Sequence, residues 1–436
     1  MRVMKWSMIA LAVSAGTTQF AMASSQDDTK GFVEDSTLTS KTRMLYMNRD
    51  YRNGAGNISK NGNGQAPFKS GYREDWGLSE LLNFESGFTQ GTIGVGVDAF
   101  AMGTVRLDGG AGRQGNGLFA TRSNGSPEDT QSKLGGAVKF RISDTVLKYG
   151  NQFVASPVFS TDDSRLLPEV ATGTLISSKE IEGLELNVGR FTALSSQTGM
   201  GRDSITSENQ DTGDEYRGLT SANVAGATYQ FTDNFVAGVA ASDVDDYFKK
   251  QYANLNYTFP IAESQALNFD FNGYRTSSQG KELAGNVDNK IWSLAAAYSI
   301  GSHKFTLAHQ RSTGDSGYYY GVDGGGTIFL TNSVQVSDFN GKDERSWQAR
   351  YNLDMAGYGV PGLSFMALYV KGDNISTSTG EGKEHEFNFE SKYVLQEGPA
   401  KDLSFRLRSA VHRATSNYAK DANDVRVIVE YPLNIL

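Results

Sequence analysis

The sequence predicts an all-β chain, and three observations support this. Polar and apolar residues alternate in many segments, no apolar stripe with helical spacing reaches a useful length, and turn residues separate the alternating segments. Successive side chains of a strand point to opposite faces, so each such segment has one apolar and one polar face. The clearest case places Phe405 and Leu407 opposite Arg406 and Arg408.

The apolar faces could meet either the core of a soluble sandwich or the hydrocarbon of a membrane. Composition favours the membrane, because 49 Gly, 24 Phe and 20 Tyr accompany 8 Pro and no Cys. Aromatic residues suit the two interfacial girdles of a transmembrane barrel. The mean hydropathy of −0.42 also fits, since only half of each barrel strand meets lipid. The lack of cysteine excludes a fold built on disulfides.

The N-terminus is typical of a secretory signal peptide. Arg2 and Lys5 precede a short apolar stretch, and a small-residue cleavage site follows at Ala21–Ala23. We therefore expect residues 1–23 to be a signal peptide and residues 24–436 to form one outer-membrane barrel domain. No later segment approaches the roughly 18 consecutive apolar residues that a membrane helix needs.

The alternating segments are distributed along the whole chain. Clear examples lie at 92–99, 138–143, 254–259, 267–272, 292–298, 347–352, 387–392, 403–412 and 425–431. Long connections rich in Gly, Asn, Ser and Asp are expected at 53–71, 108–132, 195–219 and 311–328. Allowing about ten residues for each strand, the chain predicts a transmembrane antiparallel barrel of about 18 strands, with short periplasmic turns and long extracellular loops.

Several segments resemble the OprD-type family of substrate-specific outer-membrane porins. They are Lys30–Ser36, Glu85–Thr92, Leu147–Asn151, Ser164–Pro168, Asn268–Phe271, Ser346–Tyr351 and the terminal block 398–436. The resemblance covers nearly the whole mature chain. It implies an eighteen-stranded monomeric barrel in the outer membrane of a Gram-negative bacterium, with a loose homotrimer as an open alternative. It also implies that inward-folded loops narrow the lumen and that small carboxylate-bearing solutes pass a ladder of basic residues.

Independently of the family, the polar faces of the predicted strands collect cations. These are Arg43, Lys139, Arg141, Lys148, Arg350, Lys392, Arg406, Arg408 and Arg426. We expect them to line the solute path, because arginine stays charged and binds a carboxylate through two parallel hydrogen bonds. The alternative for each residue is ordinary scatter over solvated positions. This alternative is weakest for Arg406, Arg408 and Arg426, which lie on consecutive C-terminal strands.

The third loop, near residues 157–171, is where the resemblance places the constriction of the pore. Arg165 would add a cation there, and Asp162, Asp163 and Glu169 would form an opposing acidic wall. The alternative is a solvated loop with local ion pairs.

The sequence thus predicts a substrate-selective diffusion channel, and the resemblance implies carboxylate-bearing solutes, leaning towards basic amino acids and short peptides. Alternatives are a channel for aromatic or other organic acids, a less selective general porin, a soluble secreted adhesin and, more distantly, a barrel hydrolase. We expect no enzyme activity, no cofactor and no nucleic-acid partner, and contact with outer-membrane lipid and lipopolysaccharide. The four histidines show no metal-binding spacing.

Overall fold

The computed structural model describes residues 26–57 and 71–436 of the chain. The predicted signal peptide lies outside the described residues, as does most of the connection expected at 53–71. In the described ranges, no helix is long and apolar enough to cross a membrane.

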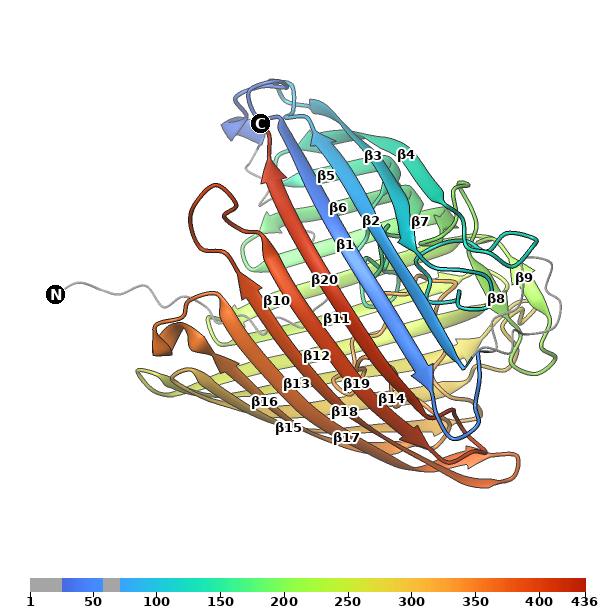
Figure 1. Cartoon of the computed structure of the whole chain (residues 1–436). Helices are drawn as coiled ribbons and strands as arrows, with labels where there is room; N and C mark the ends of the chain where they lie inside the picture. Colours follow the sequence, from blue (N-terminus) through green and yellow to red (C-terminus); the bar gives the residue numbers. More distant parts are fainter. Residues whose placement is uncertain (1–25, 58–70) are drawn as a thin grey trace.

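Within the described ranges, eighteen antiparallel strands form one closed sheet, which confirms the predicted fold class (Figure 1). Neighbouring strands of the barrel pair in order, and β1 pairs with β20 to close it. The first half comprises β1 (Thr37–Tyr51), β2 (Tyr72–Glu85), β3 (Gly94–Asp108), β4 (Thr130–Ile142), β5 (Thr145–Gln152), β6 (Val170–Ile181), β7 (Leu184–Ser195), β10 (Ala222–Thr232) and β11 (Phe235–Val244). The second half comprises β12 (Phe248–Ala262), β13 (Gln265–Ser278), β14 (Asn289–Ile300), β15 (His303–Gly314), β16 (Arg345–Asp354), β17 (Leu363–Thr377), β18 (Gly380–Val394), β19 (Ser404–Ala414) and β20 (Ala422–Asn434).

The remaining elements are small and lie in the connections. They are the hairpin of β8 (Thr206–Glu208) and β9 (Glu215–Arg217), and the 3₁₀ turns η1 (Gln26–Asp28) and η2 (Met355–Tyr358).

The alternation in sequence becomes an outer and an inner surface of the barrel. On β12, Leu255 and Tyr257 point outward and are 49% and 43% exposed. Asn254 and Asn256, which alternate with them, point inward and donate hydrogen bonds to Asp270 of β13. Apolar side chains therefore meet lipid, while polar side chains satisfy one another inside the barrel.

The two ends of the barrel differ in the length of their connections. Two-residue turns lie at one end, at 143–144, 182–183, 233–234, 263–264 and 301–302. Ser143 and Gly301 adopt φ values of 50° and 55° there, as tight hairpin turns require. Long loops lie at the other end, and we call them L2 (109–129), L3 (153–169), L4 (196–221) and L7 (315–344). The short-turn end is periplasmic and the long-loop end is extracellular.

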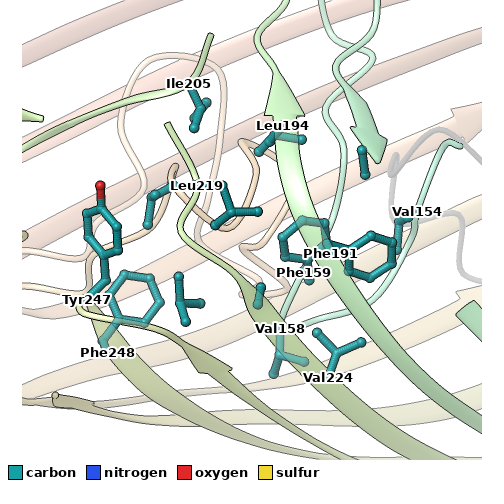
Figure 2. Packing of buried hydrophobic residues seen from close by; sticks show 14 of the residues in the cluster. Val154, Val158, Phe159, Phe191, Leu194, Ile205, Leu219, Val224, Tyr247 and Phe248 are labelled. Carbon is teal, nitrogen blue, oxygen red and sulfur yellow. The ribbon is translucent and has the colours of Figure 1, made fainter. Parts of the chain in front are cut away.

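L3 folds inward and is anchored to the barrel wall by a buried apolar cluster. Val158 and Phe159 of L3 are fully buried, and the ring of Phe159 stacks on Phe191 of β7 at 4.4 Å (Figure 2). Tyr247 in the preceding turn and Phe248 at the start of β12 belong to the same cluster. Burying one such side chain stabilises the fold by about 1.5–3 kcal/mol, so this contact holds L3 inside the lumen.

L7 is longer than the sequence predicted. The expected connection was 311–328, but β15 continues to Gly314 and the chain rejoins the sheet at Arg345. The additional residues lie within the barrel, where the Phe329 N–H donates to the Tyr274 hydroxyl at 3.0 Å and the Gln335 side chain donates to Asp424 of β20 at 2.8 Å. L7 therefore bridges the wall from β13 to β20.

Candidate solute pathway

Arg406 and Arg408 of β19 lie on the inner face of the barrel and share one carboxylate. Arg406 contacts Glu390 of β18 at 2.7 Å, and Arg408 contacts the same oxygen at 3.2 Å. Both guanidinium groups keep about a fifth of their side-chain surface exposed. Two positive charges held by one negative charge leave a net positive surface towards the lumen.

On the neighbouring strands β20 and β1, two arginines again share one carboxylate. Arg426 of β20 lies in register with Arg408, and Asp424 accepts from Arg426 and from Arg49 of β1 at 2.8 Å each. Arg426 also donates to the Gln335 carbonyl of L7 at 2.8 Å. Arg49 was not among the predicted path residues, although it points to the same inner face of β1 as Arg43.

The third group joins β1 to L3. Asp163 pairs with Lys41 at 2.6 Å and with Arg43 at 2.8 Å, and Arg43 also pairs with Glu430 of β20 at 2.7 Å. Burial alone would raise the pKa of Asp163, but the charges of Arg43 and Lys41 outweigh it and hold that pKa below its usual range. The carboxylate is therefore ionised at neutral pH and fixes L3 to β1.

Together these side chains form what we call the basic wall, on β18, β19, β20, β1 and L3. Its cations are Lys41, Arg43, Arg49, Arg406, Arg408 and Arg426, and its carboxylates are Asp163, Glu390, Asp424 and Glu430. Within the described residues, six cations of the wall thus share four carboxylates.

Arg165 of L3 lies beside this wall. Its guanidinium donates to the Asn116 carbonyl of L2 at 2.7 Å, and its own carbonyl accepts from Arg43. Burial, and next the charge of Arg426, lowers the pKa of Arg165 to about 10, so it remains a cation at neutral pH.

The acidic residues of L3 are arranged differently from the opposing wall that the sequence predicted. Asp163 lies within the basic wall, because its carboxylate is paired with two of the wall's cations. Asp162 accepts from the backbone and hydroxyl of Ser164, which shapes the loop. Glu169 is buried and accepts at 2.9 Å from the N–H groups of Asp162 and Gly325.

L3 and L7 are joined directly inside the barrel. The Ser160 N–H donates to the Asp323 carbonyl and the Gly326 N–H donates to the Ser160 carbonyl, both at 3.1 Å. Glu169 adds its bond to Gly325. Burial raises the pKa of Glu169 to about 7, and its backbone hydrogen bonds offset only part of that effect.

L7 is held on its other side by a buried ion pair. Lys250 of β12 contacts Asp323 at 2.6 Å, and both side chains are fully buried. Removing one partner of such a pair leaves an uncompensated buried charge, which costs about 3–5 kcal/mol. L3 and L7 therefore form a fixed partition across the lumen. The sequence had not predicted that L7 takes part in it.

A cavity of about 710 Å³ opens against this partition. L3 contributes residues 154–157 to its lining, and L7 contributes 329–331 and Ser333. Its amide wall, as we name it, consists of Asn254, Asn256, Asn268 and Asn272, with Asp270 at its centre. Glu185, Lys304 and Arg350 also line the cavity.

The remaining predicted path residues do not all belong to the basic wall. Arg350 lines the cavity and donates to Asn352 at 2.9 Å. Lys392 of β18 lies in register with Arg406 of β19, next to the basic wall. Lys139 and Lys148 pair with Asp98 of β3 at 2.7 and 2.5 Å, in a group of their own on β3–β5.

Arg141 holds the N-terminal segment of the described chain. Its guanidinium donates to Gln26 at 2.9 Å and to Thr29, and it lies 4.2 Å from the ring centroid of Phe88. These partners lie at the periplasmic end of β4. Arg141 therefore lies on the inner face, but its guanidinium group binds Gln26 and Thr29 of the N-terminal segment.

No group of three or more His, Asp or Glu side chains in the described ranges is arranged to hold a metal ion.

Comparison with known proteins identifies relatives along the whole chain. The family model described as outer membrane porin, OprD family, matches residues 30–435. Porin D of Pseudomonas aeruginosa is 46% identical over 465 residues, covering 100% of both chains. The crystal structure of Acinetobacter baumannii OccAB1 matches with a TM-score of 0.85 at 33% identity, covering 94% of this chain and 99% of that one. That of Pseudomonas aeruginosa OpdK with vanillate matches with a TM-score of 0.82 at 31% identity, covering 93% and 100%.

Proposed function

The chain belongs to the OprD family of outer-membrane porins and is a substrate-specific channel of the Gram-negative outer membrane, and we propose that its substrates are small carboxylate-bearing solutes, basic amino acids and short peptides foremost. The observation that carries this proposal is the basic wall, whose six cations share four carboxylates. The unneutralised positive charge attracts a carboxylate. Because it is spread over several strands, a solute meets several weak sites in turn, as conduction requires.

The preference for basic amino acids rests on the opposite side of the barrel. In strand order, β12 lies half-way round from β1, so the amide wall faces the basic wall across the lumen. Asp270 within the amide wall and Glu185 nearby can attract a cationic side chain, while amide groups can bond an ammonium or guanidinium group without holding it tightly. A solute with a carboxylate at one end and a cation at the other suits both walls at once.

The second candidate is a channel for aromatic or other organic acids. The solved structure of OpdK with vanillate supports it as a possibility within the family. In this chain, Lys304 and Arg350 line the cavity together and supply the positive charge that such an acid needs.

A liposome uptake assay tests both candidates. The purified channel is reconstituted, and the rates for arginine, lysine, vanillate, benzoate and an uncharged sugar of similar size are compared. We expect arginine and lysine to enter faster than the sugar and to saturate. Faster entry of vanillate and benzoate than of both amino acids would establish the second candidate, and equal rates for all solutes would reject selectivity altogether.

A further inference from the structure

Three exposed cations lie side by side on the outer surface of the barrel, away from the solute pathway. Arg275 of β13 is in register with Lys290 of β14, and Arg311 of β15 is in register with Trp292, the next outward residue of β14. The residues that flank the three cations along their strands are buried on the inner face. They are Tyr274, Thr276, Asn289, Ile291, Gln310 and Ser312. We call Arg275, Lys290 and Arg311 the outer cation patch.

The patch has no counter-charge of its own. Among the described residues, none of the three side chains is in an ion pair, a side-chain hydrogen bond or a cation–π contact. The next strand adds another cation, because Arg345 of β16 is in register with Arg311, although Arg345 itself is paired with Asp373. Like charges on directly opposed strand positions destabilise a sheet. A bound anion would remove that cost.

The patch lies at a defined depth in the membrane. It is near the extracellular ends of its strands, immediately beyond a row of aromatic side chains on the same outer surface. In that row His309 contacts Trp292 edge-on at 5.4 Å and stacks on Trp347 at 4.3 Å. Trp side chains mark the boundary between hydrocarbon and headgroups, and Leu294 and Leu307 below them are lipid-facing. The three cations therefore lie at the headgroup level of the outer leaflet.

We propose that the outer cation patch binds the phosphate groups of lipid A, the membrane anchor of lipopolysaccharide. Phosphate is the anion available at this depth in the outer leaflet, and the arginine fork matches its geometry through paired hydrogen bonds. The aromatic row and the apolar surface below accept the acyl chains of the same molecule. The site is separate from the lumen, so it does not depend on which solute the channel carries.

The test compares two triple variants of the full-length channel with the wild type. The first is Arg275→Gln, Lys290→Gln and Arg311→Gln. The control is Lys30→Gln, Arg217→Gln and Lys401→Gln, which removes the same charge from exposed positions outside the patch. Binding of bisphosphorylated lipid A, dephosphorylated lipid A, phosphatidylglycerol and inorganic phosphate is measured by native mass spectrometry in detergent.

We expect the wild type and the control to bind bisphosphorylated lipid A at least about tenfold more tightly than the patch variant, since each cation near an anionic surface contributes appreciably. The melting temperature of the wild type should rise on adding that lipid, and that of the patch variant should not. Unchanged single-channel conductance would show that the patch variant is folded. Equal binding by wild type and patch variant, or equal binding of the two lipid A forms, would overturn the proposal. Equal binding of phosphatidylglycerol would overturn the assignment to lipid A.

Discussion

The basic wall and the amide wall are built from the same strand geometry but present different surfaces to the lumen. On the basic wall, long charged side chains are held in place by carboxylates that they outnumber, as where Arg406 and Arg408 share Glu390. On the amide wall, short neutral side chains hold one carboxylate, as where Asn254 and Asn256 both donate to Asp270.

Under the proposed function, this difference lets a passive channel select a solute without trapping it. The partly exposed pairs of Arg406 and Arg408 with Glu390 are each worth about 0–1 kcal/mol. On the proposed pathway, this is enough to attract and orient a carboxylate but allows it to leave. The amide wall offers hydrogen bonds that a solute can exchange one at a time. The basic wall would therefore supply electrostatic attraction and the amide wall exchangeable hydrogen bonds. Changes to the two walls should have distinct effects.

The largest effect is expected from removing the L3 part of the L3–L7 partition. Deleting Ser160–Ser164 removes the L3–L7 hydrogen bonds of Ser160 and the carboxylate of Asp163 that fixes L3 to β1. Single-channel conductance should rise more than in any point variant, and selectivity among solutes should fall. The matched variant Asp163→Asn keeps the loop but removes its charge. It should raise anion preference with little change in conductance. Unchanged conductance in a heat-modifiable, folded deletion variant would show that L3 does not limit the pore.

A smaller effect is expected from anchoring L3 less firmly. Phe159→Ala removes a fully buried ring that stacks on Phe191, at a cost of about 3–5 kcal/mol to local packing. Amide hydrogen exchange in L3 should accelerate, and channel current should become noisier. Phe231→Ala, which truncates a ring that is 54% exposed on the outer face, is the control and should leave L3 protected. Equal exchange in both variants would contradict the anchoring role.

The amide wall can be tested by neutralising its carboxylate. Asp270→Asn should slow uptake of arginine and lysine by up to about fivefold, the equivalent of one exposed ion pair. Uptake of benzoate should not fall, because that solute has no cationic group to attract. A parallel decrease for benzoate would mean that the substitution narrows the lumen instead of changing its charge preference.

The smallest effect concerns pH. The pKa of Glu169 is raised to about 7 by burial, so its neutral form is favoured in the L3–L7 contact. The contribution of Glu169 to the stability of the L3–L7 contact is therefore complete below the ordinary pKa of a glutamate, near 4.5. It is lost as the pH rises through about 7. Conductance noise should increase between pH 6 and 8 (a window set by that value). Glu169→Gln stays neutral and should abolish the change. A pH response that persists in Glu169→Gln would assign it to another group.

Much of this architecture could be predicted from the sequence, because strand period translates directly into inner and outer faces. Parity alone placed Arg406, Arg408 and Arg426 on one face, and the structure brings them onto adjacent strands. The OprD-family relationship inferred from short motifs is confirmed by the family match over residues 30–435.

Loop positions were harder to predict, because parity carries no information outside strands. L7 lacks alternation, so nothing in its sequence shows that Asp323 meets Lys250 or that Gln335 reaches Asp424. Counter-ions were missed for a related reason. One partner of Arg43 is Asp163, 120 residues away in L3, and such a pairing depends on how the loop folds.

The most direct test of the basic wall is to reverse two of its charges and measure ion selectivity. In the wild type, Arg406 and Arg408 share the single carboxylate of Glu390. In Arg406→Glu with Arg408→Glu, three carboxylates, including Glu390, would face the path instead. Arg217→Glu with Lys401→Glu makes the same charge change outside the wall and serves as control. We predict that the reversal potential in a salt gradient moves towards cation preference. Carboxylate uptake should fall about tenfold or more, because each of the two arginines contributes up to about 1 kcal/mol and both charges are inverted. High salt should weaken the wild-type preference, since charges in a wet pore are screened within about 8–10 Å. An unchanged reversal potential and unchanged uptake in the folded double variant would contradict the assignment of this wall as the solute path.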